Sequence, residues 1–222
     1  MSVSGRLRNS RAAEIISVLT TLGSLAVIIF GTCEWPPSTN RRLHEAIGRT
    51  MAQQALRLLG KGGQIKVIAR DTAAFKQPAA DFQLQSFKKE VRRAGVAIAA
   101  MQLLQVDPLR PLQVPPGDFF ELIRKAPSGS VIVSFMGPPL LSDEQRLELG
   151  DTKARIVAFC SGDLADHVDL RTLFDRQLLH AAVVSRRSAA DPRNSKPAES
   201  FDQLYMSVTA ADLSALPAPR VL

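Results

Sequence analysis

The sequence contains few cysteine, histidine and aromatic residues, and their scarcity excludes several classes of protein. Among 222 residues there are two Cys, three His, one Trp and one Tyr. Two cysteines cannot build a disulfide scaffold. No metal-ligand spacing links the three histidines with either cysteine, and the chain lacks H-E-x-x-H, G-x-S-x-G and Walker A sequences. The sequence therefore predicts neither a metal nor a cofactor, and it identifies no reaction.

The shortage of aromatic residues also decides how the basic charge is interpreted. The formal net charge is +7 and the pI is about 9.9, but Phe, Trp and Tyr make up only 5% of the chain. Proteins that grip single-stranded nucleic acid interleave basic residues with stacking aromatic ones. The basic stretches are therefore interpreted as solvated faces, and an anionic membrane surface is favoured over nucleic acid as the partner. They are Lys88, Lys89, Arg92 and Arg93, and Arg186, Arg187, Arg193 and Lys196.

An uncharged run of nineteen residues, 15–33, is the strongest single feature of the N-terminus. A helix rises about 1.5 Å per residue, so this run approaches the ~30 Å thickness of the hydrocarbon core. Trp35 suits the membrane interface, and Pro36 and Pro37 end the helix. We expect a basic tail over 1–14, a single transmembrane anchor over 15–35, and a domain outside the cytoplasm. A cleaved signal peptide and a lipidated Cys33 are the alternatives.

After the two prolines, helical and strand-like patterns alternate along the chain. Amphipathic stretches carry helix caps or breakers at their ends, such as Pro78 and Gly95, Ser142 with Gln145, and Asp118 with Glu121. Between them lie short apolar runs, which are predicted strands. They cover residues 65–69, 96–104, 131–135, 156–159 and 181–184.

Near-continuous apolar strands that alternate with helices are typical of a parallel sheet covered on both faces. The sequence predicts an α/β domain over 38–187, with a single doubly wound, mostly parallel sheet of about five strands. Its expected strand order is flavodoxin-like or that of a periplasmic-binding-protein lobe. Residues 188–222 are predicted to form a polar loop, a possible edge strand over 201–208, and a tail.

Four segments between Ala46 and Arg186 resemble one lobe of the type I periplasmic sugar-binding proteins and the related LacI-type regulators. They are IGRTMAQQALRLLGKGGQIKVIA, FFELIRKAPSGSVIVSF, KARIVAFCSGDL and LFDRQLLHAAVVSR. The second resembles a helix that leads into a strand carrying ligand contacts, and the third resembles a strand that ends in G-F-D. The resemblance covers about two thirds of the chain and implies the fold more than the function.

Two departures from that family pattern bear on the ligand. Where the family commonly has an Asn-Asp pair after its third strand, this chain has Phe135 and Met136. Where the family has the Asp of G-F-D, this chain has Cys160. The resemblance therefore implies that the groups that hold a sugar have been replaced. It also implies that a second lobe is missing, so that a monomer would not capture sugar with high affinity.

Candidate binding residues follow from the position of the predicted strand ends. In open parallel sheets, ligands bind beyond the carboxyl ends of the strands. The polar residues expected there are also common turn and cap residues, which is the alternative interpretation. They are Arg70, Asp71, Thr72, Asp107, Cys160, Ser161, Asp163 and Arg186.

Two functions of different kinds are compatible with this pattern. The first is a single-pass membrane-anchored binding or assembly module that acts with a protein partner or a second copy. The second is a small-molecule enzyme in which Cys160, at a strand-to-helix turn, serves as nucleophile with His167 or His180 as base. A secreted solute-binding protein is a third possibility. We favour the non-catalytic module, with a small-molecule ligand possible and nucleic acid excluded.

Overall fold

A computed structural model describes residues 39–73, 76–105, 114–150, 154–162, 164–186 and 200–215. The predicted anchor over 15–35 lies outside these ranges. Within them, no helix combines the length and the apolar character needed to cross a bilayer. Asp107 and Asp163 also lie outside the described residues.

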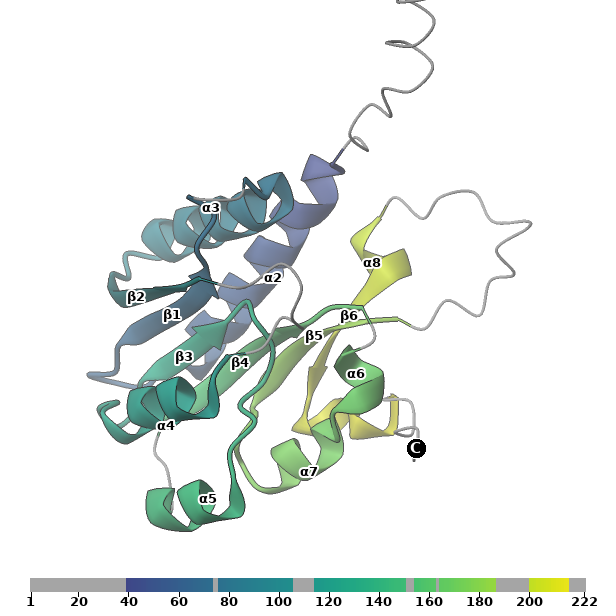
Figure 1. Cartoon of the computed structure of the whole chain (residues 1–222). Coiled ribbons are helices and arrows are strands. Elements are labelled where there is room, and N and C mark those ends of the chain that lie inside the picture. Colours follow the sequence, from purple (N-terminus) through teal and green to yellow (C-terminus); the bar gives the residue numbers. More distant parts are fainter. Residues whose placement is uncertain are drawn as a thin grey trace, which may run out of the picture. The chain divides into compact units, whose positions relative to one another are not determined.

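One six-stranded sheet organises the domain, in the order β2-β1-β3-β4-β5-β6 (Figure 1). The first five strands are parallel, and the sixth is antiparallel to β5. This confirms the predicted mostly parallel sheet, and the order 2-1-3-4-5 is that of flavodoxin-like folds. The edge strand predicted over 201–208 is present in part, because residues 205–209 form β6 whereas 201–204 form a short helix. The strands are β1 (Ile65–Arg70), β2 (Ile98–Leu104), β3 (Val131–Ser134), β4 (Arg155–Cys160), β5 (Ala181–Ser185) and β6 (Tyr205–Thr209).

Helices cover both faces of the sheet (Figure 1). On one face lie α2 (Arg41–Leu58), α3 (Pro78–Arg93) and the short α8 (Phe201–Leu204). On the other face lie α4 (Pro116–Arg124), α5 (Asp143–Leu149), α6 (Leu164–His167), α7 (Leu170–Asp175) and the 3₁₀ helix η1 (Ala210–Ala215). The sheet is therefore doubly wound, as the alternation of apolar strands and amphipathic helices predicts.

Several helices begin at capping residues or at proline, as is usual for helix starts. The side chain of Asn40 accepts a hydrogen bond from the Leu43 N–H at the start of α2, and Pro78 occupies the first turn of α3. Ser142 and Gln145 form the predicted capping box of α5. The predicted cap at Asp118 is wrong. Helix α4 begins earlier, because its N-cap is Pro115, whose successor Pro116 has a backbone preset for the first helical turn.

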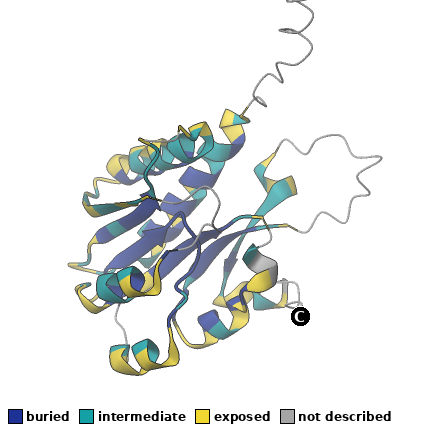
Figure 2. Cartoon of the chain, viewed as in Figure 1, coloured by how far each residue is buried: buried dark blue, intermediate teal, exposed yellow. Residues whose placement is uncertain are grey.

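The core consists of two apolar layers, one on each side of the sheet (Figure 2). Successive strand residues point to opposite faces, so Ile132 belongs to the α4–α7 layer and Val131 and Val133 to the α2–α3 layer. All four residues of β3 are buried. The central strands are therefore apolar on both faces, which explains why they appear in the sequence as continuous runs rather than as alternating patterns.

Candidate functional site

A pocket of about 230 Å³ lies at the carboxyl ends of β1, β3 and β4, on the α2–α3 face. This is the edge of a parallel sheet where ligands are expected. Its lining is partly apolar and partly polar. It is formed by α2, the end of β1 and the loop after it, α3, the segment after β3, the end of β4 and the residue after it, and the start of β6. The lining residues are His44, Ala69, Arg70, Thr72, Gln77, Ala79, Ala80, Asp81, Gln83, Leu84, Phe135, Phe159, Ser161 and Tyr205.

Four of the polar side chains in this pocket are already hydrogen-bonded in pairs. The Thr72 hydroxyl donates to Asp81 Oδ1 over 2.8 Å, which ties the end of β1 to the first turn of α3. The Gln83 Nε2 group lies 3.1 Å from His44 Nδ1 and donates to it in the neutral tautomer that carries its proton on Nε2. Burial lowers the pKa of His44, which favours that neutral ring. These pairs link α3 to α2 and to the segment after β1. They also leave these four side chains with little hydrogen-bonding capacity for a ligand.

Arg70 and Ser161 are the pocket side chains best placed to bind a ligand. Both are half-buried and line the pocket, and neither side chain makes a hydrogen bond or ion pair with another residue that the structure describes. A guanidinium offers five N–H donors, and a hydroxyl donates one hydrogen bond and accepts others. Aromatic rings also line the pocket, among them Phe159 and Tyr205, whose centroids lie 5.6 Å apart. The site combines a cation, a hydroxyl and an apolar wall.

The structure therefore brings together three of the predicted site residues, Arg70, Thr72 and Ser161, and places others elsewhere. Asp71 is a turn residue, since its Oδ1 accepts the Ala73 N–H over 2.9 Å. Arg186 joins β5 to β6, because its backbone N–H donates to the Leu204 carbonyl over 2.7 Å and its Nε donates to the Tyr205 carbonyl over 3.2 Å.

Cys160 lies on the opposite face of the sheet from the pocket. The residue is fully buried, and it belongs to the apolar layer under α4 and α7. Burial raises the pKa of its thiol to about 12. A nucleophilic cysteine requires access and a thiolate, so the predicted roles of Cys160 as ligand contact and as nucleophile are not supported. Cys160 is a small apolar core residue.

This assignment predicts how Cys160 reacts and how it can be replaced. The Cys33→Ser variant leaves Cys160 as the one cysteine of the chain. In this variant, a thiol reagent should modify Cys160 of the native protein only as fast as the protein unfolds, and it should modify Cys160 of the denatured protein at once. Cys160→Ser should lower stability by about 1–3 kcal/mol, because it buries a hydroxyl among apolar groups, whereas Cys160→Ala should cost less. Rapid modification of the native protein in an absorbance assay would contradict the assignment.

Two half-buried histidines predict a loss of stability in mild acid. Burial lowers the pKa of both His44 and His180 below the ordinary value of 6.5. The His180 Nδ1 also accepts the Ile156 N–H over 3.2 Å. The folded state favours the neutral ring of each histidine, whereas the unfolded state takes up a proton near pH 6.5. The free energy of unfolding is therefore unaffected by these two groups above about pH 6.5, and it falls as the pH drops through and below this value. The Tm should therefore drop between pH 7 and 5.5, and less so in His180→Gln. An equal drop in that variant would contradict the assignment.

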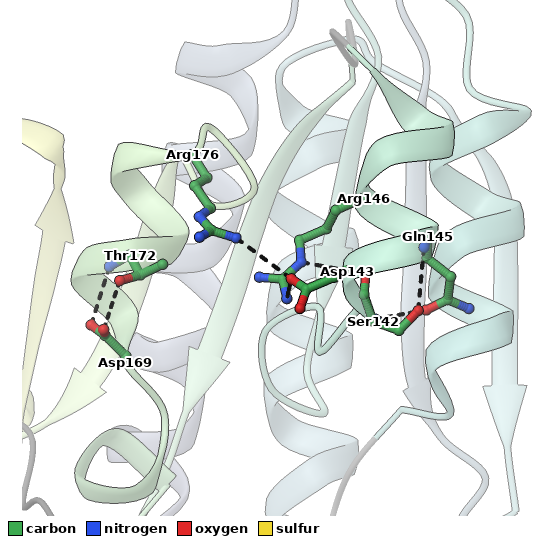
Figure 3. A network of polar contacts seen from close by, with 7 residues as sticks. All are labelled: Ser142, Asp143, Gln145, Arg146, Asp169, Thr172 and Arg176. Carbon is green, nitrogen blue, oxygen red and sulfur yellow. Dashed lines mark hydrogen bonds and ion pairs between the residues drawn. The ribbon is translucent and has the colours of Figure 1, made fainter.

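A second, shallower groove of about 670 Å³ lies on the other face, beside α5, α6 and α7. Polar side chains in and beside this groove pair with one another (Figure 3). Asp143 pairs with Arg146 and lies 3.9 Å from Arg176, and Asp169 accepts from the Thr172 hydroxyl over 2.6 Å. The Ser142–Gln145 and Asp169–Thr172 pairs cap α5 and α7, and the exposed pair of Asp143 and Arg176 spans the start of α5 and the end of α7. Within the described ranges, no group of three His, Cys, Asp or Glu residues is arranged to hold a metal ion.

Sequence reasoning missed the residues that α2 and α3 contribute, namely His44, Asp81 and Gln83. His44 and Gln83 are 39 positions apart and lie on helix faces that also carry ordinary core residues. A usable signal existed for Asp81, since ligands in such folds also approach helix N-termini at the carboxyl edge of the sheet. Asp81 is in the first turn of α3.

The fold defined by this sheet and its two helical layers is that of the type I periplasmic sugar-binding proteins, as the resemblance implies. The arabinose-binding protein AraP from Geobacillus stearothermophilus is 14% identical with a TM-score of 0.53, over 79% of this chain and 63% of that one. A sugar-binding protein of a sugar ABC transporter from Bacillus halodurans is 15% identical with a TM-score of 0.53, over 78% and 64%.

A carbohydrate transporter solute binding protein from Agrobacterium radiobacter, solved with D-arabinose, gives 15% identity and a TM-score of 0.51 over 80% and 63%. The chain thus spans less than two thirds of each of these proteins. At such identities the likeness establishes the fold alone. No protein-family model matches the sequence, and no curated protein matches it.

Proposed function

We propose that this chain is a non-catalytic, membrane-anchored binding module. It is one lobe of a solute-binding protein whose pocket beside Arg70 and Ser161 takes a small polar ligand and is completed by a protein partner. The observation that carries the proposal is the position of that pocket. It lies at the carboxyl edge of a single sheet, and the described strands form no second sheet to close over it.

The pocket's chemistry favours a polyhydroxylated ligand. The half-buried guanidinium of Arg70 and the hydroxyl of Ser161 can hydrogen-bond to hydroxyl groups, while the rings of Phe135 and Phe159 can cover an apolar sugar face. A volume of about 230 Å³ suits a single small molecule. The proteins with this fold include one that binds arabinose and one solved with D-arabinose. D-arabinose is therefore the reasonable first probe.

The same chemistry indicates that one lobe alone binds weakly. Thr72, Asp81, His44 and Gln83 are committed to hydrogen bonds within the protein. Small-molecule sites usually bury most of the ligand surface, and a pocket made by one lobe leaves one side of the ligand in water. A partner that covers the open side would supply the missing contacts.

Membrane anchoring is the second part of the proposal, and the uncharged run over 15–33 supports it. The full-length protein should remain in the membrane pellet after an alkaline carbonate wash. Release of the protein, or recovery of a form shortened at the N-terminus, would favour a secreted solute-binding protein instead.

Site-specific photo-cross-linking in cells tests the partner most directly. A photoreactive amino acid at Gln77, on the pocket wall, should give one defined adduct. The matched control is Leu147 on α5, which is 84% exposed and lies on the opposite face. An adduct from Gln77 alone supports the proposal, whereas no adduct, or equal adducts from both positions, would contradict it.

A further inference from the structure

The strand β2 forms one edge of the sheet and is hydrogen-bonded to β1 alone among the described strands (Figure 1). Ile98 pairs with Ile65, the register then shifts at a bulge beside Ala99, and the last five residues pair regularly from Lys66–Ala100 to Arg70–Leu104. The outer side of β2 therefore presents backbone N–H and C=O groups with no strand beside them. Such an edge can accept an added strand.

Two of the features that usually prevent strand addition are absent from this edge, and the bulge beside Ala99 is confined to its start. Proteins protect their edges with charged residues, especially lysine, or with proline. Between positions 94 and 106 there is neither a charged residue nor a proline. Ala99 and Ala100 are exposed, and Leu103 is 49% exposed. The edge is therefore long, apolar and open.

A groove of about 680 Å³ runs along β2 and is bordered by the last turns of α3. Lys88 and Arg92 line it. Neither side chain makes an ion pair or hydrogen bond with another described residue, whereas Arg93, one position further on, pairs with Glu90 over 2.8 Å. The groove thus combines an open strand edge with two positive charges that have no partner among the described residues.

We propose that β2 binds an extended acidic segment of a partner protein by strand addition. Backbone hydrogen bonds to β2 hold the segment, and carboxylates on alternate residues, which share one face of a strand, reach Lys88 and Arg92. The inference rests on the proposed function, because it names a surface for the partner that function requires. Helix α3 joins the two sites, since its first turns line the ligand pocket and its last turns line this groove.

A second copy of the chain fits the edge less well. Two β2 strands paired about a two-fold axis perpendicular to the sheet would keep both α3 helices on the same face. The Lys88 and Arg92 side chains of one copy would then face the same charges of the other. An acidic strand meets opposite charge instead, and charge complementarity of this kind selects between partners.

The test uses the full-length protein in mild detergent and two labelled ten-residue peptides, one alternating Val and Glu and the other alternating Val and Lys. Fluorescence anisotropy should show at least tenfold tighter binding of the Glu peptide. The variant Lys88→Glu/Arg92→Glu should reverse that preference. The matched control Lys89→Glu/Arg93→Glu makes the same change of net charge on the same helix but outside the groove, and it should keep the preference of the parent protein.

Backbone pairing is tested with two N-methylated forms of the Glu peptide. Methylating the alternate amides that face β2 should abolish binding, and methylating the other set should not. Four results would each overturn the inference. They are equal binding of the Glu and Lys peptides, equal effects of both methylation patterns, a reversed preference in the control variant as well, and a dimer that buries β2. A cross-link from Gln77 alongside any of these results would leave the proposed function intact.

Discussion

Phe87→Ala is expected to lower the free energy of unfolding by about 3–5 kcal/mol, the usual range for removing a buried phenylalanine side chain. Phe87 is fully buried between α3 and the sheet. Its ring meets that of Phe135 edge to face, with centroids 5.5 Å apart and an angle of 87°. Phe135 lines the ligand pocket, so the substitution should also loosen the pocket wall. Urea unfolding followed by circular dichroism measures the change.

Two variants serve as controls for this prediction. Phe87→Leu keeps most of the apolar volume and should cost less than about 1.5 kcal/mol. Leu147→Ala removes a side chain that is 84% exposed and should change stability by no more than about 0.5 kcal/mol. If Phe87→Ala lowered the free energy of unfolding no more than Leu147→Ala does, this result would contradict the packing of α3 against the sheet.

Gly48→Ala should lower stability even though alanine is the better helix former by about 1 kcal/mol. A Cβ at position 48 of α2 would lie 2.1 Å from the Gln83 carbonyl oxygen of α3, so the helix backbones must separate. Overpacking of this kind costs about 1–3 kcal/mol or more. His44 and Gln83 bond across the same helix pair, so the variant should also break a contact of the ligand pocket.

The matched substitution for Gly48→Ala is Gly117→Ala in α4. A Cβ there meets no atom within 4 Å, so this variant should not lose stability. Thermal unfolding of both variants separates close helix packing from helix propensity. A gain in stability for Gly48→Ala would contradict the close approach of α2 and α3.

Much of the fold was predictable because buried parallel strands leave a strong mark on the sequence. β3 and β5 are apolar on both faces, so they appear as short uncharged runs between capped helices. The same property hides which face each residue occupies. Cys160 and Phe159 are neighbours in one apolar run, yet Phe159 lines the pocket and Cys160 faces the opposite layer. Only the register of the folded sheet distinguishes them.

The pocket was predictable only in part, for a related reason. The end of a strand is a local feature, so Arg70 and Ser161 can be named from the sequence. The pairing of His44 with Gln83 depends on how two helices cross, and a close approach at Gly48 governs that crossing. The edge at β2 has a sequence signal, the uncharged stretch over 94–106, but its exposure depends on the strand order.

The most direct test of a one-lobe binding module is an NMR titration of the isotope-labelled full-length protein in detergent with D-arabinose. The account predicts saturable shifts of the Arg70 and Ser161 amide signals at millimolar sugar, lost in Arg70→Ala, while the signal of Leu173 in the second groove stays in place. Shifts at Leu173 instead, or none at any sugar concentration, would contradict it.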